Sequence, residues 1–241
     1  MSRLHWDQTG EKFYETGVEK VALYKRPTGT AKAATNSKYT AGVAWNGVSA
    51  FNLNPTGAEA TALYANNKKY LSLMSAEETA GTIEAYTYPD EWMECDGSKA
   101  VMPGVYVGQQ SRVAFGLAVK TLIGNDTEMN KKGYKIHLIY EGLASVSEKA
   151  YSTVNDSPEV DPMSWEFTTT PVDIGIDGFE PSARIEINST DFADEAGKAK
   201  LKALEDALYG TDGAGEGDGT DPYLPDPAKV FELLGWTAST T

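Results

Sequence analysis

The chain has 241 residues, and its 35 Asp and Glu against 21 Lys and Arg give a formal net charge of −14. This acidic balance argues against a general affinity for nucleic acid or anionic lipid, both of which attract cationic surfaces. The length suits one large β domain or two small ones, and a hydrophobic content of 41% is ordinary for a soluble globular protein. Because the sequence has neither a signal-peptide core nor an apolar run of ~18 residues, we expect no membrane segment.

The first 54 residues predict a strand, a basic loop and a hairpin. Residues 17–25 have the composition of a strand. Residues 26–39 are polar, and Arg26, Lys32 and Lys38 make them a basic island in an acidic protein. Asn46-Gly47 lies between apolar residues, and an Asn-Gly pair in such a place is a strong short-range signal for a β-hairpin. We therefore expect a hairpin within residues 40–54.

Residues 56–119 predict one short helix followed by several strands. Thr56 and Glu59 have the spacing of a capping box, in which the two side chains satisfy free backbone amides, so we expect a helix through about residue 65. Strands are expected at 69–74 and 82–88, on either side of a turn at 76–81. Residues 89–103 are predicted to form a loop that contains Trp92, with further extended segments at 105–107 and 112–119.

Residues 134–170 carry the clearest strand pattern and predict two strands joined by a long polar connection. Apolar and polar side chains alternate over residues 134–141, which indicates a half-buried antiparallel strand. His137 falls on the polar face and is predicted to be a surface histidine. The alternation returns around Trp165 and Phe167 in the second strand.

The C-terminal third predicts two helices separated by an acidic, glycine-rich loop. Apolar residues at spacings of three and four predict an amphipathic helix over residues 189–209, with an Asp194–Lys198 ion pair and Gly210 as its stop. Residues 211–222 are rich in Gly and Asp and predict a mobile loop. Asp226-Pro227 then begins a short helix over residues 228–234, which should dock on this chain or on a neighbouring copy.

Together these elements predict a mainly β (α+β) fold. We expect an antiparallel β-sandwich or partly closed barrel with a flanking helix at about 189–209. The domain would span residues 1–210, and residues 211–241 would form the linker and the docked C-terminal helix.

A search for chemistry yields no catalytic, cofactor-binding or metal-binding residues, so the sequence does not predict an enzyme or a cofactor. His5 and His137 are isolated, and no nucleophile elbow, zinc-protease or phosphate-binding motif occurs. The single cysteine, Cys95, stands beside Glu94 and Asp96, which should raise its pKa and disfavour a reactive thiolate. The acidic loop offers oxygen atoms that calcium could use, but it lacks the closing Glu of an EF-hand, and a simple linker is the favoured interpretation.

Aromatic residues leave one alternative open. Trp92 with Tyr86 and Tyr88 could stack on a sugar face, as in carbohydrate-binding or adhesin-like β-sandwich modules. We favour the simpler interpretation, in which Trp92 packs against its own sheet or an adjacent subunit.

Several long segments in one order resemble a known family. They are LYANNKKYLSLMSAEE from Leu63, AYTYPDEWMECDGS from Ala85, VGQQSRVAFGLAVKTLIGND from Val107, residues 134–170, and ALYGTDGAGEGDGTDPYLPDPAKVFELLG from Ala207. These segments cover most of the chain and look like the major tail (tail tube) protein of long-tailed, non-contractile bacteriophages of the siphophage type.

The resemblance implies a structural virion protein. Six copies would close into a ring by joining sheets into a continuous inner barrel, and rings would stack into a hollow tail tube through which the genome passes without specific binding. Tape-measure, tail terminator and distal tail proteins are the implied partners, and the implied location is the virion tail, with the host cytoplasm during assembly. Exposed sheet edges favour such closure. We expect Arg26, Lys32 and Lys38 to contact the acidic surface of the next ring.

Overall fold

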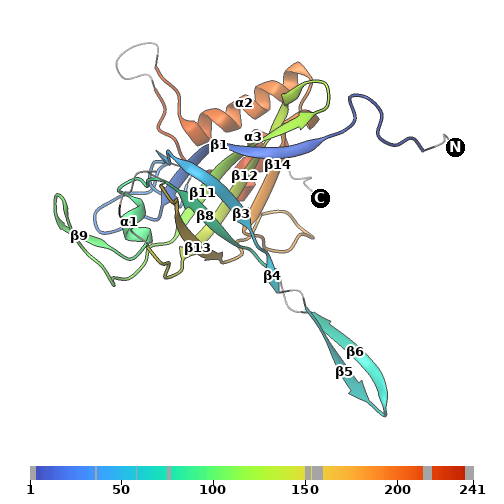
Figure 1. Cartoon of the computed structure of the whole chain (residues 1–241), viewed down its shortest axis with the longest axis horizontal. Coiled ribbons are helices and arrows are strands. Elements are labelled where there is room, and N and C mark those ends of the chain that lie inside the picture. The colour runs from blue at the N-terminus through green and yellow to red at the C-terminus, as the bar shows by residue number, and fades with distance from the viewer. Residues whose placement is uncertain are drawn as a thin grey trace.

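The computed structural model describes residues 4–35, 37–57, 59–74, 77–149, 153, 160–213 and 219–236. Its main element is an antiparallel eight-stranded sheet in the order β2-β1-β11-β12-β13-β8-β3, with β14 pairing to β12 (Figure 1). The mainly β prediction is confirmed, since strands make up 43% and helices 13% of the structure. The strands of this sheet are β1 (Tyr14–Lys25), β2 (Val43–Ala44), β3 (Val48–Leu53), β8 (Ala80–Ala85), β11 (Phe115–Asn125), β12 (Met129–Ala144), β13 (Met163–Thr169) and β14 (Arg184–Asn188).

Three smaller antiparallel pairs extend from the body of the molecule. They are β4 (Thr56–Gly57) with β7 (Glu77–Glu78), β5 (Ala60–Ala65) with β6 (Lys68–Met74), and β9 (Lys99–Met102) with β10 (Val105–Val107). The helices are α1 (Trp92–Cys95), α2 (Glu195–Tyr209) and α3 (Pro227–Leu233), with a 3₁₀ turn at Ser189–Asp191.

The large sheet folds over on itself into two layers. One layer contains β1, β11, β14 and most of β12, and the other contains β13, β8 and β3. Between them lies a core in which Leu23, Phe115 and Leu117 meet Trp165 and Phe167, all at most 1% exposed. Aromatic rings dominate this core, because the rings of Trp45, Trp92 and Trp165 contact one another at 4.6–5.8 Å between centroids. A single buried cluster therefore joins both layers.

The two end strands of the sheet are consecutive in the chain. We predicted that the Asn46-Gly47 turn would make a hairpin, and this is wrong: the turn forms, but β2 pairs with β1 and β3 pairs with β8. Gly47 has a positive φ of 75°, but Asn46 does not. The turn therefore differs from the hairpin turn in which both central residues have positive φ. It carries the chain from one end of the sheet to the other, as in a partly closed barrel.

Helices α2 and α3 cover the outer face of the first layer. Leu201, Leu204 and Leu208 of α2 pack with Leu138 of β12, and Val230 of α3 joins the same cluster. The predicted helix is confirmed over most of its length, although its first residues form the 3₁₀ turn. The short C-terminal helix is also confirmed and docks on its own chain.

Asp194 does not form the ion pair that its spacing predicts. Its carboxylate instead accepts a hydrogen bond from the backbone N of Gly197 at 2.9 Å and caps α2. Lys198 pairs with Glu195 at 2.8 Å instead. A cap satisfies an amide that would otherwise lack a partner, and this favours it over an exposed ion pair.

A strained residue marks the place where β12 changes its neighbour. Residues 135–139 of β12 pair with β14, and residues 142–144 pair with β13. Between them Glu141 has a φ of 47°, which non-glycine residues rarely adopt. Arg26 holds its carboxylate at 2.6 Å, and the Tyr39 hydroxyl donates to the same oxygen at 3.0 Å. These contacts fix the point at which the sheet divides.

The acidic loop after α2 is closed at its base by a backbone bridge. The N–H of Thr211 donates to the carbonyl of Thr220, and the reverse bond has the same length of 3.1 Å. The chain then returns over the sheet, where Leu224 is fully buried.

Candidate assembly surfaces

The β5–β6 hairpin occupies the place where we predicted a helix, and that prediction is wrong. The capping-box residue Thr56 lies in the short strand β4, and the chain turns at Asn66 and Asn67, whose φ angles are 51° and 60°. Two successive residues at positive φ define the turn type that suits a two-residue hairpin, and Asn tolerates it well. The Asn-Asn pair was the signal in the sequence, and the local capping pattern concealed it.

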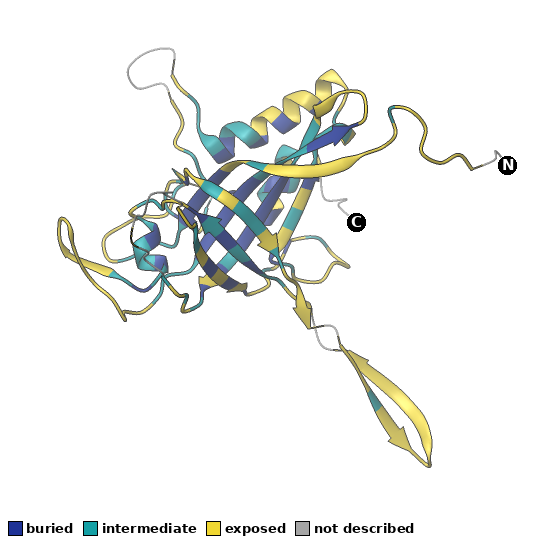
Figure 2. Ribbon diagram, viewed as in Figure 1, coloured by how far each residue is buried: buried dark blue, intermediate teal, exposed yellow. Residues whose placement is uncertain are grey.

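This hairpin projects from the body and is exposed on both faces (Figures 1 and 2). Every residue of β6 is exposed, and in β5 only Ala62 is half-buried. Leu63 stands opposite Leu71 in the register, and Leu73 follows on the same face. Tyr64 and Tyr70 are each 73% exposed. Their exposure shows that no residue in the described part of the chain covers these side chains. An isolated two-stranded hairpin is marginally stable in water.

A second exposed apolar hairpin is formed by β9 and β10. Pro103-Gly104 makes the turn, with Gly104 at a φ of 80°. All seven residues of the two strands are exposed. The large apolar ones are Val101, Met102, Val105, Tyr106 and Val107. In Figure 1, β9 lies at the opposite end of the molecule from β5 and β6.

An acidic hollow of about 230 Å³ lies between this second hairpin and α1. Ala100 and Tyr106 line it from the hairpin, and Asp90 and Glu91 line it from the segment before α1. Glu94 and Lys25 also line it and pair with each other at 2.9 Å. Within the described residues, Asp90 and Glu91 have no ion-pair partner.

The outer face of the β13-β8-β3 layer carries short polar and acidic side chains. Glu84 stands opposite Ser164, and Thr82 stands opposite both Glu166 and Asn52. These three strands contain no Lys or Arg, whereas every Lys and Arg of the large sheet lies in β1, β11, β12 or β14. None of the residues that pack with α2 and α3 comes from β13, β8 or β3. This face therefore carries acidic side chains, and neither α2 nor α3 packs over it.

The three predicted interface residues have different surroundings. Arg26 is half-buried and is held by Glu141, as described above. Lys32 and Lys38 are exposed, and within the described residues neither forms an ion pair. Among the described residues, no hydrogen bond or ion pair joins these three side chains to one another. Their role in contacts between rings stays a prediction.

Trp92 is not available to stack on a sugar. It is 0% exposed and lies in the core against Trp45, Phe115 and Trp165. The expectation that it packs against its own sheet is confirmed. Tyr86 remains 54% exposed, but without Trp92 the proposed aromatic platform is lost.

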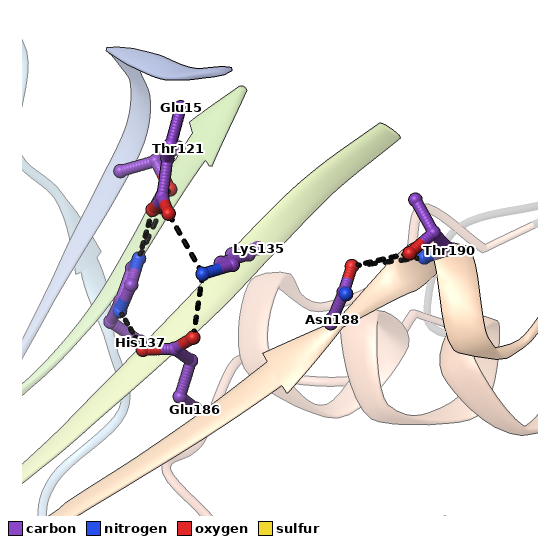
Figure 3. A network of polar contacts seen from close by, with 7 residues as sticks. All are labelled: Glu15, Thr121, Lys135, His137, Glu186, Asn188 and Thr190. Carbon is purple, nitrogen blue, oxygen red and sulfur yellow. Dashed lines mark hydrogen bonds and ion pairs between the residues drawn. The ribbon is translucent and has the colours of Figure 1, made fainter. Parts of the chain in front are cut away.

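His137 lies in a partly buried polar network rather than on an open surface, so the prediction of a surface histidine is wrong (Figure 3). The ring is 7% exposed, and its Nε2 is 3.2 Å from Glu15 and 3.0 Å from the Thr121 hydroxyl. Lys135 bridges Glu15 and Glu186 at 2.8 Å each. Burial lowers the pKa of His137, despite the two carboxylates, which favour its charged form.

The remaining candidates for chemistry are inert or lie outside the described residues. Cys95 is buried, and burial above all raises its pKa to about 12, in the predicted direction. Among the described residues there is no group of three or more His, Cys, Asp and Glu that could hold a metal ion. Two residues of the acidic loop considered for calcium, Glu216 and Asp218, lie outside those residues.

No family model matches the sequence, and a search of curated proteins finds no significant relative. None of the helices in the described residues is long and apolar enough to cross a membrane.

Proposed function

We propose that this chain is a structural subunit that self-assembles into rings, and that stacked rings form a hollow tail tube of a long-tailed, non-contractile bacteriophage. The observation that carries the proposal is the β5–β6 hairpin. It presents leucine and tyrosine side chains to solvent on both faces and has no core of its own. A contiguous apolar surface of this kind marks a binding surface, and a self-assembling subunit meets many copies of itself.

The free sheet edges support the same proposal. Within the described residues, β3 pairs only with β8 and β14 pairs only with β12. An open edge is a template for pairing with another chain, and closure around a ring leaves no edge exposed. The hairpin follows β3 and precedes β8 in the chain, so it would extend that layer toward a neighbour.

The acidic, helix-free face supports a passage for DNA. In a ring built through the β13-β8-β3 layer, the opposite layer with its helices would face outward. The inner wall would then carry Glu84 and Glu166 among short polar side chains, with no cation in these strands to hold a phosphate backbone. The genome would slide past such a wall without binding to it.

Electron microscopy of the concentrated protein tests the proposal. We expect the wild type to form rings or tubes. The double variant Leu63→Ser, Leu71→Ser should stay monomeric with unchanged circular dichroism in the body, because it removes apolar contacts only from the hairpin. Phe179→Ser is the matched control, since Phe179 is 68% exposed elsewhere on the surface. A wild type that stays monomeric at high concentration and is absent from tail shafts would exclude the proposal.

A further inference from the structure

We propose that the β5–β6 hairpin of one copy docks on the β9–β10 hairpin and the acidic hollow of the next copy. This inference rests on the proposed function and names the two surfaces through which copies join. Both hairpins carry exposed apolar side chains, and the hollow beside the second one is lined by acidic side chains.

The two surfaces cannot meet within one molecule. Figure 1 places β9 and the β5–β6 hairpin at opposite ends of the long body. A contact between them therefore joins two copies, and because the surfaces differ it is heterologous. Such a contact repeats from copy to copy and closes into a ring when the rotation per copy allows it.

The apolar side chains of the two surfaces provide the contact area. The first hairpin carries Leu63, Leu71 and Leu73 on one face. The second carries Val101 and Met102, which are 69% and 59% exposed. Burying such side chains against each other is favourable, and aromatic and methionine residues are enriched in protein interfaces.

Charge selects this pairing over a pairing of like hairpins. Residues 60–74 carry Lys68 and Lys69 and no acidic residue. Asp90, Glu91 and Glu94 line the hollow together with Lys25, which pairs with Glu94, and β9 adds the exposed Lys99. Two β5–β6 hairpins would place four lysines together, whereas docking on the hollow places Lys68 and Lys69 near Asp90 and Glu91. Complementary charge raises the association rate and excludes wrong partners.

A charge-swap experiment tests the contact. The concentration at which half of the protein is assembled is measured by sedimentation. Lys68→Glu with Lys69→Glu should raise it at least tenfold, because like charges across a contact are costly. Asp90→Lys with Glu91→Lys should do the same. In an equimolar mixture of the two variants both contacts are complementary in charge, because the two reversed surfaces face each other and the two unchanged surfaces face each other. The mixture should therefore assemble like the wild type, with the two variants alternating.

The matched control reverses another adjacent lysine pair. Lys131→Glu with Lys132→Glu makes the same charge change on β12, where both residues are exposed and Lys132 forms an exposed ion pair with Glu128 at 3.1 Å. We expect assembly within twofold of wild type. If Lys68→Glu, Lys69→Glu assembles like the wild type, or if the mixture of variants does not associate, the docking inference is wrong.

Cross-linking identifies the surfaces directly. A Lys69→Cys copy and an Asp90→Cys copy are mixed under oxidising conditions, and Cys95 does not compete because it is buried. A disulfide between the two different copies is expected. Disulfides formed mainly between two Lys69→Cys copies would show that the hairpin binds its own kind and would overturn the inference.

The inference and the proposed function fail separately. If the charge-swap variants form tubes as readily as the wild type, the tube proposal is retained and the docking contact is excluded. Open chains of copies that show the cross-link but never form rings or tubes would support the docking contact and remove the tube.

Discussion

Strands β13 and β6 both contain large apolar side chains, but those of β13 are buried or half-buried and those of β6 are exposed. Trp165 and Phe167 of β13 are at most 1% exposed, whereas Tyr70 and Leu73 of β6 are 73% and 55% exposed. Both strands pair with a neighbour, but only β13 has a second layer to pack on. The comparison shows that backbone pairing is enough to form a strand, whereas burial of its side chains also requires a second layer that packs against it. Apolar residues in a strand without such a surface point to a partner outside the chain.

The largest effect is expected from a substitution in the core between the two layers. Trp165→Ala should lower the free energy of unfolding by about 3–5 kcal/mol, because it removes a fully buried ring from the aromatic cluster and leaves a cavity. Urea unfolding followed by circular dichroism measures the change. A loss below 1 kcal/mol would mean that the two layers do not share one tightly packed core.

A smaller loss is expected where the sheet divides. Arg26→Met keeps the aliphatic stem but removes the charge beside Glu141, whose carboxylate side chain is 16% exposed. We expect a loss of about 1–2 kcal/mol, near the lower end of the range for hydrogen bonds to charged groups, because Arg26 is partly exposed to solvent. Lys38→Met, at an exposed lysine of the same loop, is the control and should stay within about 0.5 kcal/mol of wild type in the same assay.

Acidification should weaken the body through His137. Burial lowers the pKa of this ring below its ordinary 6.5, so the unfolded chain takes up a proton before the folded one. The free energy of unfolding should therefore fall as pH drops below about 6.5. His137→Gln should flatten this part of the profile. An equally steep profile in the variant would assign the slope to other groups.

Glu15 should extend the acid sensitivity to lower pH. Partial burial favours a higher pKa, but hydrogen bonds from Lys135 and Thr121 outweigh it, and the net pKa lies below 4.5. Its contribution is present above that value and is lost as pH falls through the folded pKa. Glu15→Gln should thus reduce the slope below pH 4.5 in acid titrations. No change there would exclude Glu15 as a source of the acid sensitivity.

The β5–β6 hairpin should contribute little to the free energy of unfolding. Tyr70→Ser removes an exposed ring from β6, so the free energy of unfolding should change by no more than about 0.5 kcal/mol. A larger loss would show that the hairpin packs on its own body, and the contrast with β13 would disappear.

Charge reversal in the basic loop of residues 26–39 should have the smallest effect on the stability of the subunit. Lys32→Glu with Lys38→Glu should leave single rings and folding stability unchanged and shorten the tubes, if the loop meets the next ring. Tube lengths in electron micrographs measure this. Unchanged lengths would remove the loop from the stacking contact.

Much of the fold could be predicted because its signals are local. The alternation over residues 134–141 predicted β12, and the spacing of Leu201, Leu204 and Leu208 predicted α2. The partners of β2 and β3 could not be predicted, since pairing depends on strands far away in the chain. The burial of His137 was missed for the same reason, because a local pattern does not show which layer will lie above a residue.

The candidate assembly surfaces were predicted least well. The basic residues of the 26–39 loop drew attention because charge is visible in a sequence. Leu63 and Leu71 did not, because an apolar side chain in a strand is ordinarily a core residue. Only the structure shows that the described residues leave both side chains exposed.

The fastened base of the loop after α2 has a practical consequence. Because Thr211 and Thr220 are bonded to each other, the separation of the two ends does not depend on the length of chain between them. The entropy of closing a longer loop rises only slowly with its length. A foreign peptide or a small domain grafted between these two threonines should therefore leave the fold intact and be carried on every copy.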